Sequence, residues 1–304
     1  MEHDGAIDDL LAQLLILTMD QYELIGINVT PADCYIGPAM ESTWKILKAF
    51  GKENIEIGRS DASGTNDFPA AWRAKTAIIN GLPAILRLPE APETWSGPEA
   101  SELLTRKLLE SNHPVTILMT GPCTNLVKSL EQTPEIREKI ETIIWMGGAF
   151  RTGGNVQTFE HNGSAEWNVY WDPESARRLL EMELPITCIP LDATDKVPVT
   201  MEFLKDLSRG SQTLASELAG QFWALTIDTI PGYHYTYFMW DILAASYLEI
   251  PEAFQVEEIK ASVSTRPPNA GQTLENASGK HIKVAFDIDN EAFYSYLLKQ
   301  FSKT

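Results

Sequence analysis

Three carboxylates stand close together near the start of the chain, in the run Asp-Gly-Ala-Ile-Asp-Asp at residues 4–9, and Glu2 adds a fourth acid. Carboxylates at this spacing repel one another unless a cation shares them, and oxygen donors select Ca²⁺ or Mg²⁺. The alternative is a helix N-terminus rich in acids, where Asp is favoured by capping and by the helix dipole. The cluster alone leaves both interpretations open.

Short β-like runs alternate with helical patterns along the 304 residues, which predicts an α/β fold with a mostly parallel central sheet flanked by helices. We expect strands at residues 24–29, 55–57, 115–119, 143–146 and 186–191, and helices at residues 10–17 and 38–50, the second closed by Gly51. Neither a repeat nor a long linker interrupts the pattern, so a single domain over residues 1–304 is expected. Ligands of parallel sheets gather at the carboxyl ends of the strands, where polar and Gly-rich segments follow.

Charge and cysteine usage limit the partners and the compartment. With 24 Lys and Arg against 42 Asp and Glu, the net charge of −18 predicts no binding to nucleic acid or to anionic membrane surfaces. We see no signal peptide and no apolar run long enough to span a membrane. Cys34, Cys123 and Cys188 are widely spaced and odd in number, which argues against disulfides and favours a reducing, cytoplasmic location.

Residues 2–9 resemble the Asp-x-Asp-x-x-x-Asp-Asp signature of the nucleoside hydrolases. Further motifs follow in the family's order: Thr-Gly-Pro-Cys-Thr-Asn at 120–125, Met-Gly-Gly-Ala at 146–149, Ala-Glu-Trp-Asn-Val-Tyr-Trp-Asp-Pro at 165–173 and Trp-Asp at 240–241. The resemblance covers nearly the whole chain. It implies a Rossmann-like enzyme that hydrolyses the N-glycosidic bond of ribonucleosides to free base and ribose, and a homo-oligomer, a dimer rather than a tetramer.

The resemblance also implies a metal and a base. It maps a single Ca²⁺ to Asp4, Asp9, the backbone carbonyl of Thr120 and Asp241. Carboxylate-rich oxygen coordination suits Ca²⁺, and water at a metal is more acidic than bulk water. Asp4 maps to the general base that takes the proton from this attacking water.

Four polar residues map to the ribose. By resemblance Asp8 holds one ribose hydroxyl, while Asn155, Glu166 and Asn168 hold the others. Acids around the sugar would stabilise the oxocarbenium-like ribosyl cation that forms as the bond breaks. Without the resemblance, Asn155 after two glycines would be interpreted as a turn former.

The base site resembles the purine-specific branch of the family, which prefers inosine, adenosine and guanosine. Trp72 and Trp240 map to the pair that sandwiches the purine, and Asp33 maps near the base edge. His234 lies in Pro-Gly-Tyr-His-Tyr at 231–235, where the family has an active-site loop. It is a candidate for protonating the base, and an exposed loop histidine is the alternative.

The sequence departs from the family pattern near its start. Only three residues precede Asp4, where the family has an apolar strand of about five, so we expect the first strand to be truncated or replaced by another segment. Glu2 stands in place of Asp, and Ala6 in place of an Asn that reaches a ribose hydroxyl. The alternatives are therefore a non-catalytic homologue that binds nucleoside or metal, and a broad or pyrimidine-preferring hydrolase.

Overall fold

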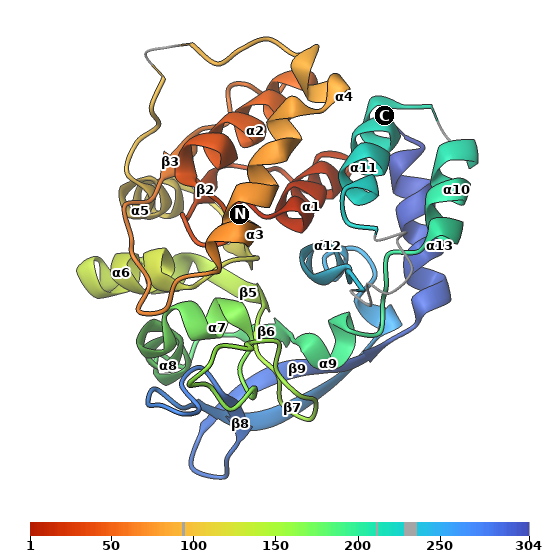
Figure 1. The fold of residues 1–304 in the computed structure, drawn as a ribbon. Helices are drawn as coiled ribbons and strands as arrows, with labels where there is room; N and C mark the ends of the chain where they lie inside the picture. Colours follow the sequence, from red (N-terminus) through yellow and green to blue (C-terminus); the bar gives the residue numbers. More distant parts are fainter. Residues whose placement is uncertain (93–94, 211, 228–235, 304) are drawn as a thin grey trace.

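The computed structural model describes residues 1–92, 95–210, 212–227 and 236–303 (Figure 1). Nine strands of these residues form one sheet in the order β3-β2-β1-β4-β5-β6-β9-β7-β8. The strands are β1 (Glu2–His3), β2 (Ile27–Val29), β3 (Ile57–Arg59), β4 (Val115–Met119), β5 (Ile140–Met146), β6 (Ile186–Ile189), β7 (Phe254–Val263), β8 (Thr273–Glu275) and β9 (Lys280–Ile288). Only the pairings of β7 with β8 and β9 are antiparallel, so the expected mostly parallel α/β sheet is confirmed.

Helices cover both faces of the sheet (Figure 1). They are α1 (Ile7–Leu17), α2 (Ile36–Ala49), α3 (Ala70–Thr76), α4 (Pro83–Leu86), α5 (Ala100–Glu110), α6 (Thr124–Gln132), α7 (Trp167–Trp171), α8 (Pro173–Glu181), α9 (Leu191–Thr194), α10 (Met201–Gly210), α11 (Leu214–Ala224), α12 (Trp240–Ser246) and α13 (Asn290–Phe301), with short 3-10 helices at Ala77–Gly81, Pro134–Lys139 and Pro251–Ala253. Along β5, Ile144 and Met146 pack with α1, α11 and α12, whereas Ile143 and Trp145 pack with α5, α6 and α8. Residues 143–146 of β5, Ile-Ile-Trp-Met, are all buried and apolar, as expected where a strand is covered on both faces.

The shortest strand, β1, lies inside the sheet between β2 and β4. β1 has two residues, Glu2 and His3, which pair with β2 on one side and with the end of β4 on the other. The order 3-2-1-4-5-6 changes direction between β1 and β4, and such a switch point is where open α/β sheets bind ligands. Asp4 and Thr120 directly follow these two strands, so the fold brings them to the same edge.

Most expected elements are present with shifted ends. α2 ends before Gly51, whose φ of 65° fits the predicted helix stop. The strand expected at residues 24–29 is only Ile27–Val29, because only these residues pair with the short β1 and β3. The three strands β7, β8 and β9 were not predicted.

The state of the cysteines and the length of the helices can be read from the described residues. Cys34, Cys123 and Cys188 are buried and form no disulfide. Within the described ranges, every helix is too short or too polar to cross a bilayer.

Candidate active site

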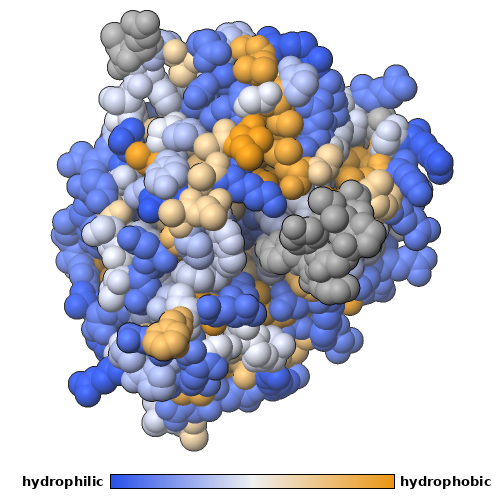
Figure 2. Space-filling model, viewed as in Figure 1, coloured by the Kyte–Doolittle hydropathy of each residue, from blue (hydrophilic) through white to orange (hydrophobic). Residues whose placement is uncertain are grey.

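A cavity of about 790 Å³ lies at the carboxyl ends of β1 and β4. In the space-filling view, apolar side chains over α3 and α4 gather beside a hollow near the middle of this face (Figure 2). Ten residues predicted for the site line the cavity: Asp4, Asp8, Asp33, Trp72, Thr120, Asn155, Glu166, Asn168, Trp240 and Asp241. Asp9 is fully buried beside this lining, and His234 lies outside the described residues.

Four of these acids form two close pairs. Asp4, Asp8, Asp9 and Asp241 are each at most 4% exposed, and hydrogen-bonding contacts join Asp4 to Asp9 and Asp8 to Asp241. Burial, and then the neighbouring acids, hold the pKa of Asp4 and of Asp241 well above the usual range. Burial also raises the pKa of Asp9 to about 7. Two carboxylates in contact must share a proton or a cation.

The chemistry of the donors fits Ca²⁺. The two carboxylate pairs make no ion pair with a Lys, Arg or His in the described part of the chain, so a bound cation would supply the missing charge. The Thr120 carbonyl accepts one hydrogen bond, from Asn168 Nδ2 at 3.0 Å, and has a second lone pair. Across the described ranges, no three His, Cys, Asp or Glu side chains are already arranged as a metal site. The acids therefore have the right donors but are paired with one another.

Asp9 also caps α1. Its Oδ2 accepts the Ala6 N–H at 2.8 Å, and its Oδ1 accepts the Thr120 hydroxyl. The capping and the metal interpretations of this cluster are thus compatible, because Asp9 orders the first turn of the helix and lies against Asp4.

His3 supports the same turn, although its sequence context did not mark it. Its Nδ1 accepts the Gly5 N–H at 3.1 Å, and its Nε2 lies 3.2 Å from the Thr43 hydroxyl. Burial lowers the pKa of His3 to about 3, so the ring is neutral. Gly5 has a φ of 81°, and a Cβ there would lie 2.4 Å from the Cβ of Ala39. Only glycine fits this turn between Asp4 and α1.

The loop that ends at α7 brings Glu166 and Asn168 to the cavity. Glu166 accepts the N–H groups of Asn168 at 2.7 Å and Gly148 at 3.0 Å, and burial raises its pKa to about 7. Asn168 Nδ2 donates to the carbonyls of Thr120 and Met146. Thr120 directly follows β4, and Met146 is the last residue of β5. These bonds fix both side chains relative to the ends of the two strands.

Two buried oxygen atoms in the cavity lining have no hydrogen-bond donor among the described residues. Asn155 Oδ1 and Asp33 Oδ1 are buried and accept no hydrogen bond from the described residues. A buried acceptor without a donor is costly, so both atoms suit a ligand that carries hydroxyl or N–H groups.

Aromatic side chains form two walls of the cavity. Trp72 is 40% exposed and meets Trp167 edge-on, with 5.5 Å between ring centroids. Trp240 meets Tyr237 edge-on at 4.7 Å. Trp145 and Trp223, which have no place in the site, are almost fully buried as core residues.

Two residues of the site were not predicted from the sequence. The Tyr237 hydroxyl donates to Asp8 Oδ1 at 2.8 Å, and Asp195 accepts the Trp240 indole N–H at 3.1 Å. The partners are 229 and 45 residues apart in the chain. The only signal for Tyr237 is that it lies four residues before Asp241, and Asp195 had none.

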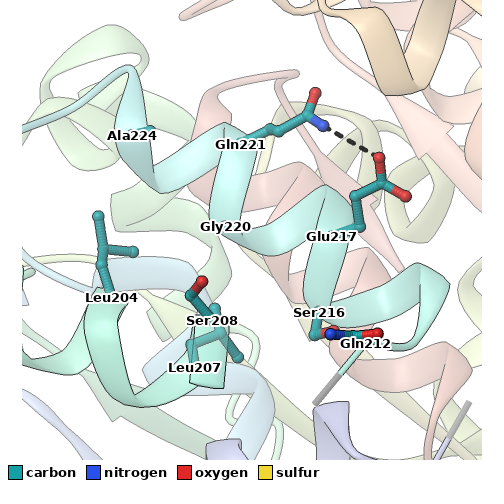
Figure 3. Close-up of a pocket in the computed structure, with 9 residues that line it drawn as sticks. All are labelled: Leu204, Leu207, Ser208, Gln212, Ser216, Glu217, Gly220, Gln221 and Ala224. Atoms are coloured by element: carbon teal, nitrogen blue, oxygen red, sulfur yellow. Dashed lines mark hydrogen bonds between the residues drawn. The ribbon is translucent and has the colours of Figure 1, made fainter. Parts of the chain in front are cut away.

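A second cavity, of about 510 Å³, lies between α10 and α11 (Figure 3). The one carboxylate in its described lining, Glu217, accepts a hydrogen bond from Gln221 at 3.3 Å and pairs with Arg87. This carboxylate is exposed and already paired. The cluster of buried acidic side chains lies in the larger cavity, which is therefore the candidate active site.

Comparison with known proteins identifies the family of this chain. Residues 1–295 match the family model of the inosine-uridine preferring nucleoside hydrolases. The chain is 27% identical over 318 residues to the pyrimidine-specific ribonucleoside hydrolase RihA of Klebsiella pneumoniae, covering 98% of this chain and 96% of the relative. It superposes on a crystal structure of an inosine-uridine preferring nucleoside hydrolase from Bacillus anthracis with a TM-score of 0.91 and 35% identity, over 100% of this chain and 98% of that one. A purine-preferring ribonucleoside hydrolase from Gardnerella vaginalis shares the fold, with a TM-score of 0.82 and 23% identity over 99% and 98% of the chains. The chain belongs to the inosine-uridine preferring nucleoside hydrolase family and is an enzyme that hydrolyses the N-glycosidic bond of ribonucleosides.

Proposed function

We propose that this enzyme is a Ca²⁺-dependent purine ribonucleoside hydrolase in which Asp4 is the general base. The observation that carries the proposal is the pairing of four buried carboxylates without an ion-pair partner among the described residues, at the floor of a cavity. Asp4, Asp9, Asp241 and the Thr120 carbonyl would hold the metal. A bound Ca²⁺ would supply the positive charge that keeps these acids ionised and that makes a nearby water more acidic.

The reaction needs one proton acceptor and one stabiliser of positive charge. The ionised Asp4 takes a proton from the attacking water, whose oxygen bonds to C1′ of the ribose. The bond from C1′ to the base breaks, and its electron pair leaves with the base, which takes up a proton. The ribose becomes cationic in between, and the surrounding acids stabilise that charge.

The ribose is held by Asp8, Asn155, Glu166 and Asn168 in this proposal. Asn155 Oδ1 supports it, because this buried acceptor has no donor in the described part of the chain. Glu166 and Asn168 support it through the backbone contacts that fix them at the cavity. Ala6 also lines the cavity and lacks the amide of the purine-specific branch, so the ribose has one contact fewer.

The base is held between Trp72 and Trp240, with Asp33 at its edge. Both indoles line the cavity. Trp167 packs edge-on against Trp72, and Tyr237 and Phe238 pack edge-on against Trp240, which keeps the two rings in place. A role for His234 in protonating the base remains a prediction, because His234 lies outside the described residues.

A pyrimidine preference is the second candidate, favoured by the 27% identical relative that is named as pyrimidine-specific. The test is hydrolysis of inosine and uridine, each with Ca²⁺ and with a chelator. Base stacking contributes about 1–3 kcal/mol per base, so we expect inosine to exceed uridine in kcat/KM by at least about tenfold. Trp240→Ala should lower purine turnover more than pyrimidine turnover. Faster hydrolysis of uridine would establish the second candidate, and full activity in chelator would contradict the metal.

We further propose a cytoplasmic homodimer. The three free, buried cysteines fit a reducing compartment, and the family resemblance supports the dimer. Light scattering of the purified protein at twice the mass of the 33.9 kDa chain would support the dimer, and a monomer mass would contradict it.

A further inference from the structure

Asp195 follows α9 and lies against the cavity wall that Trp240 forms. It accepts the Trp240 indole N–H at 3.1 Å, and its own N–H donates to the Leu191 carbonyl at 3.1 Å. Both Asp195 and Trp240 line the cavity. In the described ranges Asp195 makes no ion pair, and the Trp240 indole donates a hydrogen bond to its carboxylate. The charge of Asp195 also acts on Glu166, whose pKa it helps to raise.

The backbone fixes Asp195 relative to Trp240. Just after Asp195, Val197 and Val199 exchange hydrogen bonds with the segment just before Trp240: Met239 N–H donates to the Val197 carbonyl at 2.9 Å, and Val199 N–H donates to the Tyr237 carbonyl at 2.8 Å. Pro198 and Phe238 form the bridge between these bonds. Residues 197–199 and 237–239 thus form a short two-stranded segment, called here the clip, which holds Asp195 near Trp240.

We propose that Asp195 is a positioning residue that sets the orientation of the Trp240 ring and makes its face more negative, and that it thereby speeds departure of the base. A carboxylate that accepts an indole N–H pushes electron density into the ring, and a more negative ring face attracts positive charge more strongly. The inference rests on the proposed stacking of the base on Trp240.

The effect is specific to the transition state. The leaving base takes the electron pair of the broken bond and one proton, and it is most positive while protonation runs ahead of bond cleavage. Asp195 itself transfers no proton. A contact that strengthens only as charge develops raises kcat more than it lowers KM.

The experiment is a double-mutant cycle with Asp195→Asn and Trp240→Phe. Asn keeps an acceptor but loses the charge, and Phe keeps an aromatic face but loses the N–H. We expect Asp195→Asn to lower kcat on inosine about three- to tenfold with KM changed by less than about twofold, as for a contact of cation–π size. In the Trp240→Phe background the same change should have almost no further effect. Asp195→Glu, which keeps the charge, should retain more of the rate than Asp195→Asn.

A second substrate separates electronic from structural effects. The leaving group of 4-nitrophenyl riboside departs as an anion without protonation, so Asp195→Asn should leave its turnover within about twofold. An equal loss on both substrates, or an undiminished loss in the Trp240→Phe background, would overturn the inference.

If the wild type hydrolyses uridine but not inosine, the proposed purine preference fails on its own. The same cycle on uridine then decides the inference, since coupling between the two variants supports it and independent effects refute it.

Discussion

Replacing Tyr237 by Phe removes one hydroxyl from the site and keeps the ring that packs against Trp240. That hydroxyl donates at 2.8 Å to Asp8, a carboxylate that is only 4% exposed. The Asp241 N–H approaches the other oxygen of Asp8 at 3.4 Å, a longer contact than the bond from Tyr237. A hydrogen bond to a charged group contributes about 1.5–3 kcal/mol. If Asp8 orients a ribose hydroxyl, kcat/KM should fall about 10- to 150-fold.

The assay is release of base from inosine by Tyr237→Phe, with Tyr294→Phe as the matched control. The Tyr294 hydroxyl donates to the Pro198 carbonyl at 2.6 Å, which lies in the same clip. Loss of that bond should lower the melting temperature while kcat/KM stays within about twofold. If Tyr237→Phe also stays within twofold, then the Tyr237 bond does not orient Asp8 for the substrate, and the reasoning from this bond is refuted.

Two further predictions concern the buried acids. Calorimetry after chelation should show one Ca²⁺ site in the wild type and none in Asp9→Ala. Equal Ca²⁺ binding by both proteins would contradict the assignment of Asp9 as a metal ligand. Burial raises the pKa of Glu166 from 4.5 to about 7, so the folded protein keeps a proton there that the unfolded chain has already lost. The free energy of unfolding should therefore fall as pH rises from 4.5 to 7, by up to about 1.4 kcal/mol per pH unit from this group. Glu166→Gln in chelator should lack this contribution and gain melting temperature relative to the wild type across that window, whereas parallel pH profiles would show that Glu166 is ionised throughout.

The parts of the site that follow parallel strands could be predicted from the sequence. Residues 117–119 of β4 and 143–146 of β5 are buried and apolar, and Gly121 and Gly147 follow them closely, which indicates buried parallel strands with a loop at the carboxyl end. Asp4 and Thr120 follow neighbouring strands, so their proximity is a consequence of sheet order. The residue type of Asn155 alone favours a turn former over a ribose contact. Its place in the cavity lining comes from the hydrogen bond of its backbone N–H to the Ala165 carbonyl.

Contacts between distant segments could not be predicted. Tyr237 and Asp195 are in the site because the clip pairs residues 197–199 with residues 237–239, and neither segment has the alternating pattern of a strand. β1 could not be recognised as a strand, because two residues are too few to show any periodicity. Its position between β2 and β4 is set by backbone pairing.

The central claim is that Asp4 takes the proton from the attacking water. The most direct measurement is kcat and inosine affinity of Asp4→Asn in saturating Ca²⁺, since Asn preserves size and removes the base. We predict a loss of about 10²–10⁴-fold in kcat with inosine binding changed by only a few fold. A loss below about tenfold, with binding intact, would mean that another group takes the proton and would contradict the mechanism.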